Sequence, residues 1–269
     1  MSDPRSYLFV PGDRPDRFSK AASSGADVVI FDWEDAVGPS RKDVARQEVV
    51  RWFQQGGTGV VRINGTDTPF FDADLAAILS CEGAVIMVPK ATMSSWKTIG
   101  SLLPRSPLLM LVETVEGLLD INAIACAKGV SRLAFGNLDF GADARIPGTG
   151  AILDPARFQI VIASRHGNLA PPIDGVTPAI DDEHALTNEV RHARALGFTA
   201  KLCIHPKQVA AVNSGFMPTQ EELEWATAVI GALEESRGGV VQLNGKMIDK
   251  PLIDHARRIL DTCQRFAEG

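Results

Sequence analysis

The sequence predicts an α/β protein built on a closed parallel (β/α)₈ barrel, and three observations support this prediction. Short apolar runs alternate with helical segments along most of the chain, which is the pattern of parallel strands joined by helices. The length of 269 residues suits one such barrel, which needs about 250 residues. Charged residues also follow strand after strand at the same end, namely Asp32, Glu34, Asp35, Arg62, Lys90, Glu113, Asp139 and His205. Because the carboxyl ends of barrel strands meet around one opening, these charges predict a shared polar pocket.

Eight strand–helix repeats account for the chain up to about residue 215. The predicted strands cover residues 6–11, 26–32, 60–65, 84–90, 108–114, 131–140, 171–178 and 199–206. The second of them is a nearly unbroken β-rich run, as expected for a strand covered on both faces. The sixth of these includes its loop. The predicted helices cover 15–22, 40–57, 71–81, 94–103, 115–129, 154–168 and 182–197. Ser40 and Asp154 are the expected caps of two helices, with Pro155 at a first helical position.

The remaining chain is predicted to be an extension of the barrel. It contains a long helix at 219–239 with Thr219 as its N-cap, a short extended piece at 240–249 and an amphipathic helix at 250–269. A closed barrel cannot accept these elements, so they must pack outside it or on a neighbouring subunit. We therefore expect a barrel at 1–215 and a C-terminal helical extension at 216–269.

Composition excludes several classes of function. The net charge of −6 argues against a nucleic-acid partner, which usually requires a basic face. No apolar run approaches the roughly 18 residues of a membrane span, and the first residues lack the apolar stretch of a secretory signal. Four widely separated cysteines without a CxxC pair are expected to be reduced packing residues in a cytoplasmic protein.

Glu113 and Asp139 form the strongest candidate pair. Each follows one of two neighbouring predicted strands, and neither has a His or Cys nearby in sequence. Two carboxylates in this position suit Mg²⁺, which takes one or two protein carboxylates and leaves its other positions to water and substrate. The alternative is that each carboxylate forms an ion pair with a basic neighbour or caps a helix.

Arg62 is the candidate anion-binding residue. A guanidinium at a strand end can hold a substrate carboxylate or carbonyl oxygen through two hydrogen bonds, although a structural salt bridge to Asp32 or Glu34 is equally compatible with the pattern. Asp32 and Glu34 lie at alternate positions of an extended segment and so share a face. We interpret them as groups that orient Arg62 or metal-bound waters, and a solvated acidic turn is the alternative.

The turn after the first strand and the end of the eighth carry weaker signals. In Pro11-Gly12-Asp13-Arg14, glycine would let the backbone approach a ligand, and Arg17 would suit a phosphate, but a simple surface turn has the same pattern. His205 suits a packed residue or a catalyst. The chain contains no GxSxG, P-loop or GxGxxG motif, which argues against common hydrolase and nucleotide-binding functions.

Several motifs taken in order resemble one protein family. RSYLFVPGDRPDRFSKA, DWEDAV, VRING, VPKA, ETVEG, FGNLDFGAD, CIHPKQV and GKMIDKP are together similar to the citrate lyase β-subunit-like proteins of the HpcH/HpaI aldolase and malyl-CoA lyase group. The resemblance extends from residue 5 to about residue 260. Two departures are Trp33 in DWEDAV, where a smaller residue is usual, and the absence of an aromatic residue in GVTPAIDD, which predicts a different acyl pocket.

The resemblance implies a (β/α)₈ (TIM) barrel, a Mg²⁺ ion and a CoA thioester substrate. By this resemblance Glu113 and Asp139 are the Mg²⁺ ligands, and Arg62 holds the oxygens of a keto acid. Asp249 of GKMIDKP matches an acidic residue that family members supply from a neighbouring subunit, which implies a homotrimer or larger assembly. The resemblance places CoA phosphates near Pro11, Gly12, Arg17, Lys20 and Lys201.

The expected function is Mg²⁺-dependent cleavage or formation of a carbon–carbon bond in a 3-hydroxyacyl thioester such as malyl-, citramalyl- or citryl-CoA. Asp249 is the candidate acid–base group, since a buried carboxylate can titrate near neutrality. Alternatives are a CoA-independent aldolase, a thioesterase or malate-synthase-like enzyme, and a citryl-carrier-protein lyase subunit that acts within a complex.

Overall fold

The computed structural model describes residues 4–235, 241–243 and 246–267 of the chain. These residues form two compact units, Pro4–Asn213 and the chain from Ser214 onward. Each unit is described by itself. The expectation that the C-terminal extension packs on the barrel or on a neighbouring subunit stays a prediction.

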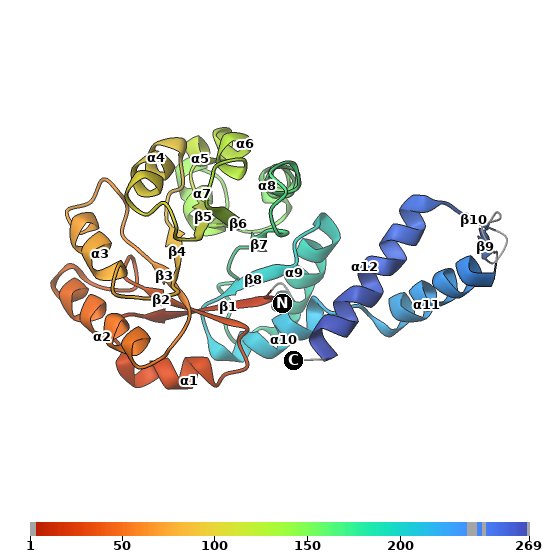
Figure 1. Ribbon diagram of the computed structural model, residues 1–269, viewed down its shortest axis with the longest axis horizontal. Helices are drawn as coiled ribbons and strands as arrows, with labels where there is room; N and C mark the ends of the chain where they lie inside the picture. Colours follow the sequence, from red (N-terminus) through yellow and green to blue (C-terminus); the bar gives the residue numbers. More distant parts are fainter. Residues whose placement is uncertain (1–3, 236–240, 244–245, 268–269) are drawn as a thin grey trace. The chain divides into compact units, whose positions relative to one another are not determined.

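The first unit is a closed barrel in which every pair of neighbouring strands is parallel (Figure 1). Its strands are β1 (Ser6–Pro11), β2 (Val28–Asp32), β3 (Val60–Arg62), β4 (Val85–Val88), β5 (Leu108–Val112), β6 (Val130–Phe135), β7 (Ile173–Asp174) and β8 (Ala200–Cys203). They follow one another around the barrel in sequence order, and β8 closes it by pairing with β1. The predicted (β/α)₈ fold is therefore confirmed.

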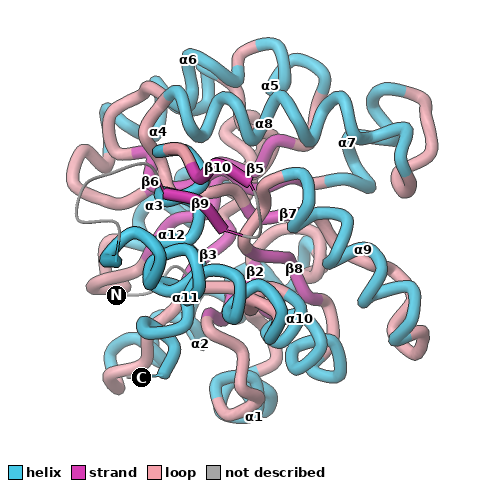
Figure 2. Tube along the Cα trace, turned by 90° about the vertical axis from the view of Figure 1, so that its right-hand side faces the viewer, coloured by secondary structure: helices cyan, strands magenta, loops and turns pink. Residues whose placement is uncertain are grey.

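Helices surround these strands, as Figures 1 and 2 show from two sides. Between β1 and β6 they are α1 (Phe18–Ala22), α2 (Lys42–Gln54), α3 (Phe71–Ile78), α4 (Met93–Leu102), α5 (Val115–Leu119) and α6 (Ile121–Ala125). After β6 come α7 (Asn137–Ala144), α8 (Asp154–His166), α9 (Glu183–Leu196) and α10 (Val209–Gly215). Short 3₁₀ turns η1 (Pro15–Arg17), η2 (Pro39–Arg41), η3 (Ala151–Leu153) and η4 (Pro206–Gln208) precede α1, α2, α8 and α10.

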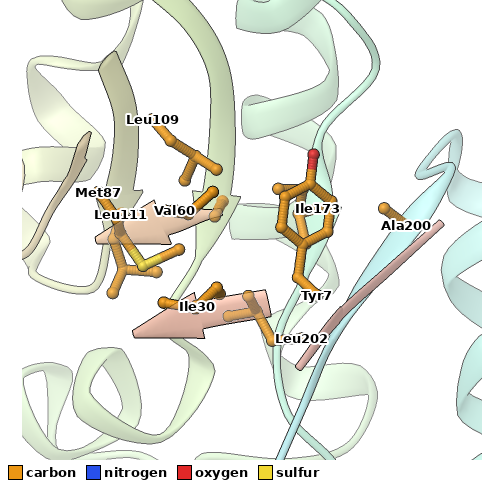
Figure 3. Packing of buried hydrophobic residues seen from close by; sticks show 10 residues of the cluster. Tyr7, Ile30, Val60, Met87, Leu109, Leu111, Ile173, Ala200 and Leu202 are labelled. Atoms are coloured by element: carbon orange, nitrogen blue, oxygen red, sulfur yellow. The ribbon is translucent and has the colours of Figure 1, made fainter. Parts of the chain in front are cut away.

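Side chains that alternate along the strands fill the barrel interior (Figure 3). The interior cluster consists of Tyr7, Ile30, Val60, Met87, Leu109, Leu111, Ala134, Ile173, Ala200 and Leu202. Because successive side chains of a strand point to opposite faces, every second residue faces the interior. Continuing this alternation past Ile30, Val60 and Leu111 directs Asp32, Arg62 and Glu113 into the opening at the carboxyl ends. The apolar layer thus forms the floor on which the polar pocket rests.

Three local predictions are wrong. Ser40 does not cap α2, because it lies within η2 and the helix begins at Lys42 after Arg41. Asp154 is the first residue of α8 rather than its cap, which is Leu153. The expected loop around Asp139 is helical, since α7 begins at Asn137 immediately after Gly136.

The second unit contains α11 (Gln220–Glu235), the antiparallel pair β9 (Val241–Leu243) and β10 (Lys246–Ile248), and α12 (Lys250–Ala267). Thr219 accepts a hydrogen bond from the Glu222 amide, and the Glu222 carboxylate accepts one from the Thr219 amide, so the predicted N-cap is a capping box. The expected end of this helix at 238–239 lies outside the described residues. Ala226, Val229, Ala256 and Ile259 form the buried contact between α11 and α12.

None of the helices in the described ranges combines the length and apolar character that a membrane span requires.

Candidate active site at the carboxyl ends of the barrel strands

Asp32 and Arg62 form the most tightly bonded pair of the site. They occupy paired positions on β2 and β3, and the guanidinium donates from Nε to Oδ1 at 2.7 Å and from its second terminal nitrogen to Oδ2 at 2.6 Å. Both side chains are buried. Burial opposes the charge on Arg62, but the neighbouring Asp32, Glu34 and Glu113 carboxylates outweigh it and raise the pKa of the guanidinium. The salt bridge between Arg62 and Asp32, which was the alternative to substrate binding, is therefore present.

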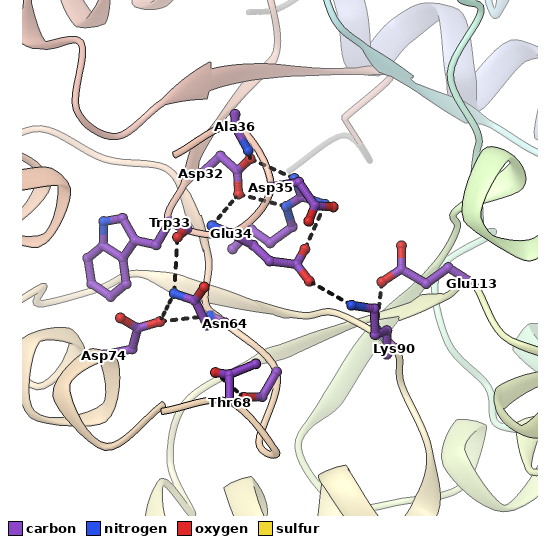
Figure 4. Close-up of polar contacts among 12 residues, drawn as sticks. Asp32, Trp33, Glu34, Asp35, Ala36, Asn64, Thr68, Asp74, Lys90 and Glu113 are labelled. Atoms are coloured by element: carbon purple, nitrogen blue, oxygen red, sulfur yellow. Dashed lines mark hydrogen bonds and ion pairs between the residues drawn. The ribbon is translucent and has the colours of Figure 1, made fainter. Parts of the chain in front are cut away.

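Asp32 also holds the turn that follows β2. Its Oδ1 accepts a hydrogen bond from the Glu34 amide at 2.9 Å, and its Oδ2 accepts one from the Ala36 amide at 3.0 Å. Each oxygen therefore accepts one bond from Arg62 and one from the backbone. Figure 4 shows the two contacts from the Glu34 and Ala36 amides to the Asp32 carboxylate. The acidic segment is a fixed part of the site rather than a solvated turn.

Glu34 lies between two cations, Arg62 and Lys90. Its Oε2 is 3.0 Å from a terminal nitrogen of Arg62, an ion pair that lacks hydrogen-bond alignment, and its Oε1 is 3.5 Å from the Lys90 ammonium. Burial raises the pKa of Glu34 to about 7, against the lowering effect of Arg62, and Asp35 and Asp32 raise it further. Glu34 can thus gain or lose a proton near neutral pH.

Glu113 follows β5 and is buried, with 2% of its surface exposed. Its Oε1 accepts a hydrogen bond from the Lys90 backbone amide at 2.7 Å (Figure 4). Burial raises the pKa of Glu113 to about 8, and the charges of Glu34 and Asp139 contribute in the same direction. The protein alone supplies too little positive charge to favour the ionised form of this carboxyl group, and a bound cation would supply that charge.

Gly136 makes room for this carboxylate. A Cβ atom at position 136 would lie 2.4 Å from the Glu113 Cβ and 2.6 Å from its Oε2. The same glycine ends β6 and precedes α7, whose first turn carries the exposed Asp139. Asp139 influences the pKa of Glu113, so the two predicted metal ligands belong to one electrostatic site although one is buried and the other exposed.

The residues present fit a Mg²⁺ ion. Asp32, Glu34, Asp35, Glu113 and Asp139 gather around Arg62 and Lys90, so acidic groups are in excess. Among the described residues, no three His, Cys, Asp or Glu side chains form a ready-made metal cage. An open arrangement of one or two carboxylates is typical of Mg²⁺, which keeps several water ligands.

A cavity of about 700 Å³ connects this site with the turn after β1. Its walls include Asp32, Arg62 and Asp139 from the site, and Pro11, Arg17 and Lys20 from the first repeat. The structure thus brings Arg17 and Lys20, two of the predicted phosphate-binding cations, to one opening with Asp32 and Arg62. His205 and Val176 also line this cavity.

Position 12 requires glycine for a different reason from the ligand approach that the sequence suggested. Its amide donates to the Asp32 carbonyl at 2.8 Å, and a Cβ atom there would lie 2.8 Å from that carbonyl oxygen and 2.8 Å from the Trp33 ring. The close backbone approach is therefore to the protein's own acidic turn. Trp33 is fully buried beneath the site and leaves no space for a side chain at position 12.

The buried position of Lys201 contradicts its expected contact with a CoA phosphate. Its side chain is fully buried, and its ammonium is 2.9 Å from Asp174 and 3.4 Å from Glu189. The physical reason is the alternation along β8, where Ala200 and Leu202 face the interior and Lys201 faces the surrounding helices. A phosphate could reach this ammonium only by displacing Asp174.

Asp249 belongs to the C-terminal unit and lies between β10 and α12. Its side chain is exposed, and its Oδ1 accepts a hydrogen bond from the Leu252 amide at 3.3 Å. Its catalytic role stays a prediction.

A buried network beneath the site was not identified from the sequence. The Lys42 ammonium donates to the Trp33 carbonyl at 2.6 Å, the Glu34 carbonyl at 2.7 Å and the Asn64 Oδ1 at 2.7 Å. Asp74 accepts from the Asn64 side chain at 2.6 Å (Figure 4). These bonds fasten the acidic turn to the end of β3. No local pattern distinguishes Lys42 from the other charged residues of its helix.

Comparisons with known proteins show which proteins this chain resembles. A model described as HpcH/HpaI aldolase/citrate lyase matches residues 5–206, and one described as a C–C bond lyase of the TIM-barrel fold matches residues 160–267. A citrate lyase subunit beta-like protein of Mycobacterium tuberculosis is 36% identical over 94% of this chain and 93% of its own length. A (3S)-malyl-CoA thioesterase of Cereibacter sphaeroides is 31% identical over 98% of this chain and 95% of its own.

The similarity extends to solved structures. The crystal structure of CitE from Mycobacterium tuberculosis in complex with magnesium, acetoacetate and coenzyme A superposes with a TM-score of 0.86 and 32% identity, covering 98% of this chain and 99% of that one. The similarity therefore spans both units in sequence. The chain belongs to the HpcH/HpaI aldolase/citrate lyase family.

Proposed function

We propose that this protein is a Mg²⁺-dependent carbon–carbon lyase. It would cleave, or form in reverse, a 3-hydroxyacyl thioester such as malyl-, citramalyl- or citryl-CoA, giving an acyl thioester and a 2-keto acid. The observation that carries the proposal is the excess of buried carboxylates around Arg62 at the opening of a cavity of about 700 Å³. The relatives solved with magnesium, acetoacetate and coenzyme A support the same assignment.

Glu113 and Asp139 would hold the metal ion. When bound, Mg²⁺ supplies Lewis-acid polarisation of the keto-acid oxygens. The unusually high pKa of Glu113, about 8 and caused mainly by burial, supports this assignment because a cation would favour the ionised form.

Arg62 would hold the carboxylate of the keto-acid half of the substrate. Asp32 fixes the guanidinium through two hydrogen bonds of 2.7 and 2.6 Å, so its direction is set before the substrate arrives. Such pre-organisation lowers the entropy cost of substrate orientation. Arg17 and Lys20, at the wall of the same cavity, would meet the phosphates of a CoA carrier.

Asp249 is the proposed acid–base group. In cleavage, a carboxylate takes the proton of the 3-hydroxyl group, the bond between C2 and C3 breaks, and its electron pair passes to the thioester fragment as an enolate. Protonation of C2 of that fragment completes the reaction. Asp249 would come from a neighbouring subunit, so the proposal includes a homotrimer or a larger homo-oligomer.

The first experiment is a screen of malyl-, citramalyl- and citryl-thioesters with Mg²⁺ and with EDTA, using both CoA and carrier-protein thioesters. We expect a 2-keto acid and an acyl thioester only when Mg²⁺ is present. Asp139→Ala should abolish this turnover while the circular dichroism spectrum is unchanged. Full activity of a folded Asp139→Ala protein would reject the metal assignment.

Thioester hydrolysis is the second candidate, because two kinds of relatives at similar identity carry different activities in their names. Product analysis separates the two candidates. Hydrolysis releases free CoA and an intact hydroxy acid, whereas cleavage of the carbon–carbon bond releases a keto acid. Turnover of a free hydroxy-keto acid would indicate a CoA-independent aldolase, and activity only with copurified partners would indicate a complex subunit.

A further inference from the structure

Lys90 follows β4 and has a backbone conformation that is unfavourable for a lysine. Its φ angle is +44°, in the left-handed region that residues with a Cβ atom rarely adopt. Strained residues of this kind concentrate at functional sites, where surrounding contacts maintain them. The contacts of Lys90 therefore indicate what the strain supports.

The backbone contacts alone do not account for a lysine at this position. The Lys90 amide donates to the Glu113 Oε1 at 2.7 Å, and the following Ala91 amide donates to the Leu111 carbonyl at 3.0 Å. Both bonds hold the turn against β5. Glycine would make the same two bonds without the strain, so the side chain must supply the reason for the lysine.

The side chains of Lys90 and Arg62 approach different carboxylate oxygens of Glu34. Its ammonium is 3.5 Å from the Glu34 Oε1, while the Glu34 Oε2 is 3.0 Å from a terminal nitrogen of Arg62. Figure 4 shows Lys90 between the Glu34 and Glu113 carboxylates. Glu34 is thus attracted in two directions at once.

The attraction of Glu34 by two cations matters because few nitrogens of Arg62 remain for a substrate. Its Nε and one terminal nitrogen are bonded to Asp32, so the other terminal nitrogen is the part that a keto acid can share. Glu34 already approaches that nitrogen without hydrogen-bond alignment. If Lys90 did not attract its Oε1, Glu34 could turn fully onto Arg62 and compete with the substrate.

We propose that Lys90 is a positioning residue that draws Glu34 away from Arg62 and so keeps the guanidinium available for the carboxylate of a 2-keto acid. The inference rests on the proposed function, since it assumes that Arg62 binds this group. It adds a residue whose side chain acts through Glu34, while its backbone amide donates to the Glu113 side chain.

The main test is Lys90→Met, which keeps an unbranched side chain, one atom shorter, and removes its charge. Calorimetric titration with pyruvate and with glyoxylate, in saturating Mg²⁺, measures the keto-acid Kd without turnover. We expect the Kd to rise by about 10-fold or more, the scale on which loss of a group that orients a metal ligand weakens metal binding or activity. Mg²⁺ alone should bind at least as tightly as in the wild type, because the peptide contact to Glu113 remains and a positive charge is gone. Lys90→Arg, which keeps the charge, should restore most of the keto-acid affinity.

Lys90→Gly provides a second, independent readout. It removes the ammonium but also the strain, so its Tm should be no lower than that of the wild type, while its keto-acid Kd should rise as in Lys90→Met. Should Lys90→Met fail to fold, Lys90→Gly carries the test.

Arg145 offers a matched control. It is also cationic, exposed and left-handed, with φ +57° at the end of α7. Arg145→Gly and Arg145→Met should leave keto-acid binding unchanged.

The outcomes separate the inference from the proposed function. A folded Lys90→Met protein that binds keto acids as tightly as the wild type overturns the inference alone, as does a Lys90→Gly protein that is less stable than the wild type. A wild-type protein that binds neither Mg²⁺ nor a keto acid overturns the proposed function and this inference together.

Discussion

Substitution of Gly136 by alanine tests the geometry of the site with one added methyl group. The backbone angles of Gly136, φ −91° and ψ 75°, lie near the inverse γ-turn region, which alanine also adopts. The substitution therefore acts through space rather than through the backbone. The new Cβ atom would lie 2.4 Å from the Glu113 Cβ and 2.6 Å from its Oε2.

The size of the effect follows from these distances. Ordinary contacts of a Cβ atom begin at 3.4 Å, so Glu113 or its strand must move by roughly 1 Å. A displacement of about 1 Å at a reacting centre can cost ~100-fold in rate, or about 2.7 kcal/mol of transition-state stabilisation. Overpacking a buried site of this kind costs about 1–3 kcal/mol in the free energy of unfolding.

Two measurements check this prediction, namely kcat/KM at several Mg²⁺ concentrations and urea unfolding of the metal-free protein. We expect Gly136→Ala to bind Mg²⁺ at least 10-fold more weakly, the range for residues that orient metal ligands. Gly38→Ala is the control, because its φ is −64° and its Cβ atom would meet nothing within 4 Å. Wild-type Mg²⁺ affinity and kcat/KM in Gly136→Ala would show that Glu113 is not held as described.

Three further predictions concern charge. Burial raises the pKa of Glu113 to about 8 and that of Glu34 to about 7, from 4.5, so the folded metal-free protein binds more protons than the unfolded chain between these values. Its free energy of unfolding should therefore fall as the pH rises from about 4.5 to 8, and urea unfolding should show a smaller fall in Glu113→Gln. Lys201→Ala should destabilise the protein by about 3 kcal/mol, because it leaves the buried Asp174 with one cation fewer, and CoA affinity measured by calorimetry should not change. Asp249→Ala should lower kcat much more than it raises KM in steady-state assays, and an unchanged kcat would remove Asp249 from the mechanism.

Much of the site could be predicted because its residues end regular strands. Asp32, Arg62 and Glu113 each continue an inward-facing series on β2, β3 or β5, and the carboxyl ends of parallel strands meet at one opening. Strand order and the alternation of side chains are enough to bring such residues together. The closed barrel followed from the same repeated pattern.

The errors arose where tertiary contacts decide the structure. Lys201 follows the same strand pattern as Arg62, but it faces the helices, and only the partners Asp174 and Glu189 show that it is buried. Gly12 was predicted to let the backbone approach a ligand, but the sequence could not reveal that the Asp32 carbonyl and the Trp33 ring occupy the space beside it. Asp139 lies on a helix rather than in a loop because Gly136 ends the strand early.

Lys90 could be placed at a strand end but not given a role. Its left-handed conformation depends on a bond to Glu113, 23 residues further along the chain. Short-range patterns carry no information about such a partner. The same holds for Lys42, whose three acceptors come from the turn after β2 and from Asn64 after β3.

The two-residue period of the strands has a practical consequence for redesign. Neighbouring positions on β8 face different sides of the barrel wall. Leu202 packs in the interior, whereas Lys201 joins the ion pairs beneath the helices. A mutational library restricted to interior-facing positions would alter the shape of the cavity floor and leave those ion pairs in place. A single-residue deletion within a strand would exchange the two sides and should abolish folding and binding together.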